Sequence, residues 1–348
     1  MYDVDALRRQ VVSALAAPRA GVVSRALLLE AGCDHELALR EVRARRWLEL
    51  LPGIYLTSPG PADLVQRCHA ALLHTGRRGR ITGAAGCWLH GLAGIREPDG
   101  PVRVLVDHET TRSTNETCSL VRTRHLPASV EHRLPGLRPL LLADLPRCVA
   151  DAVRDCRSLR DARAIGTAGR RDPRVDWDAV VMHARRPGPG AGHLPRVVHD
   201  IVDGIRSAPE GDLHDHLLPA ARRGVLPPYL LNPDVYVDGV LMGSPDAWFL
   251  GLGLGDEQDS EEWHGTADLL DTTLLRHERW RGVGLLLHHA TPKRFRRDPA
   301  AHIRTLAGLA AERRTLLAPE PPGLVVLARG PLLPARTPWP QVEGRRAA

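Results

Sequence analysis

Residues 21–57 read GVVSRALLLEAGCDHELALREVRARRWLELLPGIYLT, and their pattern indicates the fold of the N-terminal region. It contains apolar residues at helical spacing and ends in an extended run that Pro52-Gly53 breaks into a hairpin. Together with the segment before it, this stretch predicts three helices and one extended run, at residues 5–15, 24–31, 35–46 and 47–57. Three helices followed by a hairpin in so short a segment are typical of a winged helix-turn-helix.

The predicted helix at residues 35–46 carries the charge that a DNA-binding helix needs. Arg40, Arg43, Arg45 and Arg46 lie on faces other than its apolar one. Guanidinium groups bind phosphates and guanine edges, and a helix fits the major groove, so we expect these arginines to contact double-stranded DNA. The alternative is that the helix serves for packing or dimerisation, and that its arginines form only a solvated face.

The same stretch, together with TGAAGCWLHGL at residues 82–92, resembles the N-terminal region of actinobacterial AbiEi-type antitoxin and transcriptional regulator proteins. The similarity extends from the N-terminus to residue 92. The resemblance implies a DNA-binding regulator of a toxin-antitoxin or defence system. It also implies a nucleotidyltransferase-like toxin as a partner.

A group of carboxylates in the final third of the chain forms a second candidate site. SPDAWFLGLGLGDEQDSEEWHG at residues 244–265 contains Asp246, Glu257 and Asp259. If residues 246–259 form one strand, the alternating leucines share one face, and Glu257 and Asp259 point to the other. Together with Asp246 they are expected to hold Mg²⁺, which prefers oxygen ligands and promotes phosphodiester hydrolysis.

This region is similar in order and spacing to the PD-(D/E)xK nuclease-like domain of the very-short-patch-repair type. The matching features are Glu210 on an opening helix, LPPYLLNPDV at residues 226–235, Pro245-Asp246, Glu257-x-Asp259, Trp263-His264, Arg276 on the next helix, and a strand before Thr291-Pro292. The resemblance implies that Asp246, Glu257 and Asp259 bind the metal. It implies Glu210 as a further catalytic acid. It also implies that His264 is an acid-base group and that Arg276 contacts a phosphate.

Two features depart from that family. Positions 256 and 258 are usually apolar, but they are Asp256 and Gln258 here. Burying an unpaired carboxylate is costly, so we expect an exposed strand end or an eroded site. Asp259 stands where many nucleases of this fold keep a lysine, which leaves the general base unassigned. The alternative is a solvated acidic loop on a retained but inactive fold.

The remaining histidines indicate no site. His214, His216 and the pair His288-His289 lack cysteine or carboxylate partners at zinc-finger spacing. We therefore expect them to have core or surface roles.

Composition limits the other possibilities. The 348 residues carry a formal net charge of +6, which permits a nucleic-acid partner. The 6 cysteines form no CxxC pair, as is common in a reducing cytosol. Neither a signal peptide nor an apolar run long enough for a membrane helix is visible, so we expect a cytoplasmic protein without a membrane partner.

The sequence as a whole predicts an α/β multidomain protein with an α-rich middle. The expected parts are a winged helix-turn-helix at 1–58, a mixed α/β antitoxin-like region at 59–145, a helical connector at 146–205, a restriction-endonuclease-like α/β domain at 206–318 and a tail at 319–348. Two functions remain open: a regulator that reads an operator, and a Mg²⁺-dependent DNA endonuclease targeted by the winged helix. Carboxylates of Asp246, Glu257 and Asp259 that converge on one cation would favour the enzyme, and divergent carboxylates would favour the regulator.

Overall fold

The computed structural model of the chain describes residues 4–185, 192–258, 267–316 and 319–334. The chain divides into two compact units. The N-terminal unit comprises residues 1–156 and 168–192, and the C-terminal unit comprises residues 157–167 and 193–348. Both units contain helices and sheets, which confirms the predicted α/β class.

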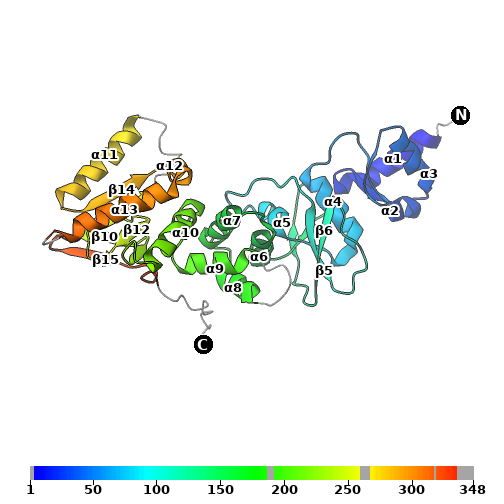
Figure 1. Cartoon of the computed structure of the whole chain (residues 1–348). Coiled ribbons are helices and arrows are strands. Elements are labelled where there is room, and N and C mark those ends of the chain that lie inside the picture. The colour runs from blue at the N-terminus through cyan, green and yellow to red at the C-terminus, as the bar shows by residue number, and fades with distance from the viewer. Residues whose placement is uncertain (1–3, 186–191, 259–266, 317–318, 335–348) are drawn as a thin grey trace. The chain divides into compact units, whose positions relative to one another are not determined.

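The first part of the N-terminal unit has the helices and the hairpin expected from its sequence (Figure 1). Two of its helices begin at local caps, where Ser24 accepts a hydrogen bond from the backbone N–H of Leu27 and Asp34 accepts one from that of Leu37. The hairpin turns at Gly53, whose φ of 72° suits a residue without Cβ. Its elements are Val4–Ala16 (α1), Ala17–Arg19 (η1), Val22–Ser24 (β1), Arg25–Glu30 (α2), His35–Arg43 (α3), Leu48–Leu51 (β2) and Ile54–Leu56 (β3). The three strands form an antiparallel sheet in the order β1-β3-β2.

A five-stranded sheet in the order β6-β5-β4-β8-β7 forms the rest of the N-terminal unit, together with several helices. The segment at residues 62–92 is not one continuous helix, because the short strand β4 divides it. Strand β4 lies in the middle of the sheet, between β5 and β8, so tertiary pairing outweighs local helical preference there. The elements are Leu64–Thr75 (α4), Gly76–Arg78 (η2), Arg80–Ile81 (β4), Gly83–Leu89 (α5), Val102–Asp107 (β5), Cys118–Thr123 (β6), Val130–His132 (β7), Leu140–Leu142 (β8), Leu145–Asp155 (α6) and Trp177–Arg185 (α8). Helix α7 (Leu159–Arg171) begins in the C-terminal unit and ends in the N-terminal unit.

The described residues of the C-terminal unit form two sheets. One has four strands in the order β14-β13-β12-β9, in which β13 and β14 are parallel, and the other has three in the order β11-β10-β15. The elements are Leu194–Val202 (α9), Ala208–Arg222 (α10), Tyr229–Leu231 (β9), Asp234–Val237 (β10), Val240–Gly243 (β11), Ala247–Phe249 (β12), Leu254–Gln258 (β13), Ala267–Gly282 (α11), Leu286–Ala290 (β14), Pro292–Arg297 (α12), Pro299–Arg314 (α13) and Leu324–Leu327 (β15). None of the described helices of either unit is long and apolar enough to cross a membrane.

Two segments of this unit form hairpins. The first consists of β10 and β11, which Asp238 and Gly239 join in left-handed backbone conformations with φ of 50° and 75°. The single strand expected at 246–259 is β12 and β13, which pair antiparallel with each other. Because the chain turns at residues 250–253, the alternating leucines of this segment, Leu250, Leu252 and Leu254, do not lie in one strand.

Helices cover both faces of the four-stranded sheet (Figure 1). Leu217 of α10 and Leu306 of α13 share a core with Phe249 on one face. Trp280 of α11 packs with Trp248 on the other face. Successive residues of β13 and β14 therefore face different helices, as strand geometry requires.

Candidate functional site

Asp246 and Glu257 lie side by side in the sheet. Ala247 of β12 is opposite Asp256 of β13, so the residue before β12 lies beside Glu257. The backbone N–H of Gln258 donates a hydrogen bond of 2.7 Å to Asp246 Oδ2. Burial and the nearby charges of Glu210 and Glu257 raise the pKa of Asp246 well above its usual range. Asp246 is therefore close enough to Glu210 and to Glu257 to be affected by the charge of each.

Glu210 and Glu257 each have other polar partners. Glu210, in the first turn of α10, accepts hydrogen bonds from Arg206 N at 2.8 Å and Asn232 Nδ2 at 2.7 Å. Glu257 forms an ion pair of 2.9 Å with Arg276 Nη1. Arg276 thus lies at a carboxylate in this structure, and its contact with a phosphate remains a prediction.

Two residues of the predicted site, Asp259 and His264, lie outside the described residues. Asp246, Glu257 and Glu210 are therefore the part of that site that the structure describes. Among the described residues, the ligand atoms of these three do not form a group close enough to share a metal ion.

A different cluster does form such a group: Asp256, His288 and His302. Their possible ligand atoms all lie within 4.8 Å of one another, so this cluster can hold a metal ion. Asp256 accepts a hydrogen bond of 2.7 Å from His288 Nδ1 on one oxygen and one of 2.8 Å from His302 Nε2 on the other. The three side chains come from β13, β14 and α13.

Asp256 is fully buried, with 0% of its side chain exposed. Burial alone would raise the pKa of this carboxyl, but the hydrogen bonds from His288 and His302 outweigh it and lower the pKa. The expectation that the strand end is exposed at this position is therefore wrong, because the two imidazoles satisfy the buried carboxylate. The expected core or surface role for His288 is likewise incomplete, because His288 has a carboxylate partner. That partner is Asp256, which lies 32 residues earlier in the sequence.

The two polar groups of β13 lie on opposite faces of the sheet. Asp256 contacts His302 of α13, whereas its neighbour Glu257 contacts Arg276 of α11. His289, the neighbour of His288 on β14, also faces α11, where it stacks on His277 with ring centroids 3.7 Å apart. The predicted carboxylate site and the Asp256–His288–His302 cluster are consequently separate.

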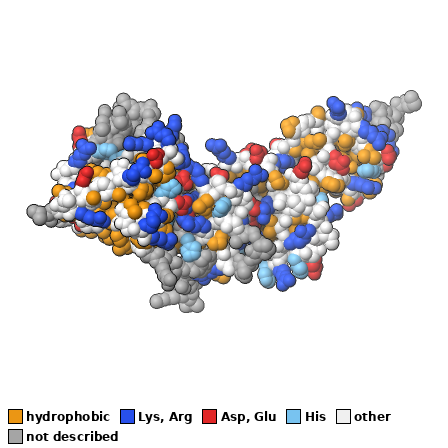
Figure 2. Space-filling view, in the orientation of Figure 1, with side chains coloured by type: hydrophobic (Ala, Val, Ile, Leu, Met, Phe, Trp, Pro, Cys, Tyr) orange, Lys and Arg blue, Asp and Glu red, His pale blue; other side chains and the backbone are white. Residues whose placement is uncertain are grey.

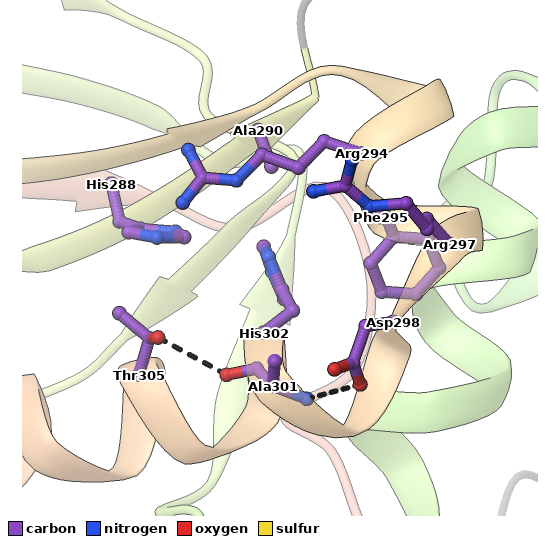
Figure 3. Close-up of a pocket in the computed structure, with 9 residues that line it drawn as sticks. All are labelled: His288, Ala290, Arg294, Phe295, Arg297, Asp298, Ala301, His302 and Thr305. Atoms are coloured by element: carbon purple, nitrogen blue, oxygen red, sulfur yellow. Dashed lines mark hydrogen bonds between the residues drawn. The ribbon is translucent and has the colours of Figure 1, made fainter.

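A pocket of about 200 Å³ opens beside this cluster (Figure 3). His288 and His302 belong to its wall. Arg294 and Arg297 lie along the upper side of the view, above His302. Asp298, also in the wall, accepts a hydrogen bond of 2.8 Å from the backbone N–H of Ala301 at the start of α13.

The helix that supplies these arginines is strongly basic. Its sequence PKRFRR contains four cationic side chains and no acidic one, and all four are exposed. Figure 2 shows Lys and Arg side chains gathered over this part of the C-terminal unit. A pocket with this wall favours an anionic ligand.

The arginines predicted to contact DNA are all exposed, but their surroundings differ. Arg40 and Arg43 lie in the last turn of α3, and Arg45 follows it with a φ of 56°. Arg46 forms a bidentate ion pair with the buried Glu41, with Nε–Oε2 at 2.6 Å and Nη2–Oε1 at 3.0 Å. We therefore expect Arg46 to stabilise the end of α3, a role different from the DNA contact predicted for it.

Comparisons with known proteins give little guidance. No protein-family model and no curated protein matches the chain. A solved structure, that of the RV2827C protein from Mycobacterium tuberculosis, has 20% sequence identity over 53% of this chain and 77% of that chain, with a TM-score of 0.29. A similarity of this size carries no functional information, so the residues themselves have to support any assignment.

Proposed function

We propose that this chain is a DNA-binding regulator whose N-terminal unit binds duplex DNA through α3 and the β2–β3 hairpin. The supporting observation is the element order α1, β1, α2, α3, β2, β3, with β3 between β1 and β2 in the sheet. This order is the one expected of a winged helix-turn-helix, whose recognition helix enters the major groove.

The two sides of α3 support this assignment. Leu37 and Ala38 are buried, and they share a core with Trp47 and Tyr55 of the hairpin region. Arg40 and Arg43 lie on the exposed side. The helix therefore packs with one face and presents basic side chains with the other.

The position of the charges indicates what these side chains contact. Glu36 occupies the first turn of α3, whereas Arg40 and Arg43 occupy the last, with Arg45 just beyond. Arginines gathered at one end of a helix suit the phosphate backbone, which positions a protein without reading sequence. We assign these three arginines to phosphates.

Binding of the full chain to a duplex, followed by fluorescence anisotropy, tests the proposal. The double variant Arg40→Ala, Arg43→Ala should bind more weakly than the wild type. Arg133→Ala is a matched control, because Arg133 is exposed in the same unit but follows β7 and pairs with Glu131. Equal affinity of the double variant and the control would remove α3 from the interface.

The biological class of the regulator rests on the sequence resemblance. An antitoxin-like role and a nucleotidyltransferase-like toxin as partner belong to the proposal on that ground. A pull-down of such a toxin by the full chain would test them.

A Mg²⁺-dependent DNA endonuclease is the second candidate, because Asp246 lies against the charges of Glu210 and Glu257. A hard cation held by Asp246, Glu257 and Asp259 would relieve this repulsion. The regulator is favoured, because Glu210 and Glu257 already have the polar partners described above. Cleavage of duplex DNA in Mg²⁺ or Mn²⁺ that disappears in Asp246→Asn would establish the enzyme.

A further inference from the structure

We propose that Asp256, His288 and His302 form a binding site for a transition-metal ion of the Zn²⁺ type, with an open coordination position that takes a phosphate-like oxyanion. This inference is independent of DNA binding by the N-terminal unit. It also uses a different side chain of β13 from the carboxylate site, whose Glu257 lies on the other face of that strand.

The geometry of the three side chains supports the metal. Asp256 is held between two imidazole nitrogens at 2.7 and 2.8 Å, and the possible ligand atoms span at most 4.8 Å. A divalent ion bound to these atoms would replace the two N–H protons that now fill the space between the ring nitrogens and the carboxylate. Little movement is then needed to bring the ligands to metal–nitrogen distances of about 2.0–2.1 Å.

The ligand types select the metal. Two imidazoles and one carboxylate are borderline donors, which suit Zn²⁺, Co²⁺ or Fe²⁺, whereas Mg²⁺ prefers oxygen alone. Three protein ligands leave a fourth position for water or another ligand, as in zinc sites that bind substrates.

The pocket indicates what occupies that position. It opens beside His288 and His302, and Arg294 and Arg297 line it (Figure 3). One carboxylate neutralises only half the charge of a divalent ion, so the site stays cationic. Two arginines next to a cationic centre bind an oxyanion with several charge-assisted hydrogen bonds, and phosphate has the oxygens to accept them.

Cobalt tests the metal site directly, because four-coordinate Co²⁺ absorbs visible light more strongly than the hexaaqua ion. Metal-stripped full chain should bind one equivalent of Co²⁺ with this absorption, and Zn²⁺ should displace it. His288→Gln and His302→Gln should weaken binding by at least the roughly 10–100-fold found for the outer shell of metal sites. Glutamine is chosen because its amide can still donate a hydrogen bond to Asp256. Circular dichroism of the metal-free variants checks that they fold.

His289→Gln is the matched control. His289 is the neighbour of His288 on β14, but it stacks on His277 at the other face of the sheet. This variant should bind Co²⁺ like the wild type. The metal proposal is overturned if the wild type gives no such absorption, if the His288 and His302 variants keep it, or if His289→Gln loses it.

Inorganic phosphate tests the second half of the proposal. It should shift the Co²⁺ spectrum of the wild type and of Arg296→Ala, whose side chain is on α12 but does not line the pocket. The shift should be lost in the double variant Arg294→Ala, Arg297→Ala. A spectrum that phosphate leaves unchanged in the wild type, or that shifts equally in the double variant, overturns the oxyanion assignment.

Discussion

Replacing Arg163 with alanine should destabilise the C-terminal unit more than any change of an exposed arginine. The side chain of Arg163 is 1% exposed. Its Nε donates to Asp200 at 2.8 Å, and its two terminal nitrogens donate to Asp215 at 2.7 and 2.8 Å. Burial lowers the pKa of Arg163, but these bonds outweigh it, so the pKa is raised and the charge is retained.

The expected loss follows from what remains after the substitution. Removing one partner of a buried ion pair costs about 3–5 kcal/mol, because the other charge stays buried. Arg196 still donates to Asp200 at 2.7 Å and to Asp215 at 2.6 Å, so we expect the lower end, about 3 kcal/mol. Arg160→Ala is the control on the same helix: Arg160 is 42% exposed, and its ion pair with Asp212 should contribute at most about 1 kcal/mol.

Hydrogen exchange measured by mass spectrometry on the full chain checks this prediction. Peptides from α9, α10 and the four-stranded sheet should exchange roughly a hundredfold faster in Arg163→Ala, since each 1.4 kcal/mol is about tenfold. The same peptides should change little in Arg160→Ala. Equal protection in the two variants would refute the reasoning that the buried network stabilises this unit.

Three further results are expected. The hydrogen bond from Arg46 lowers the pKa of Glu41, so the stability that Glu41 contributes is present above its unfolded pKa of about 4.3 and is lost as pH falls through the lower folded value. Acid titration should therefore destabilise Glu41→Gln less than the wild type, and equal losses would contradict the shift. Mg²⁺ should raise the Tm of the wild type but not of Asp246→Asn if the carboxylates of Asp246, Glu257 and Asp259 bind it, and a wild-type Tm that Mg²⁺ leaves unchanged would remove this carboxylate metal site. Arg46→Ala should lower the Tm and leave the salt dependence of DNA binding unchanged, whereas a shallower salt dependence would return Arg46 to the interface.

The parts of the fold that sequence predicts are those that local signals determine. Ser24 and Asp34 cap α2 and α3 where the sequence places the helix starts. The Asp238-Gly239 turn between β10 and β11 is also a local signal. By contrast, β10 pairs with β15 across almost a hundred residues, from Asp234 to Leu327, and no local pattern reveals such a partner.

In the candidate site, too, local signals are predictable from the sequence and distant contacts are not. The alternation of side chains along β13 correctly places Glu257 and Leu254 on opposite faces of the sheet. This prediction depends only on the local geometry of the strand. The contact of Asp256 with His302 depends on how α13 crosses the sheet, 46 residues later. Sequence alone therefore identifies Asp256 as an anomaly in an apolar position, and only the packing explains it.

The salt dependence of duplex binding by the full chain shows whether Arg40 and Arg43 of α3 contact DNA phosphates. Each phosphate contact contributes about 0.9 to the slope of log K against log salt concentration, because it releases counterions. DNA binding through α3 predicts a steep slope for the wild type and a slope shallower by about 1.8 when Arg40 and Arg43 are both alanine. Absence of duplex binding, or a slope that this double substitution leaves unchanged, would contradict it.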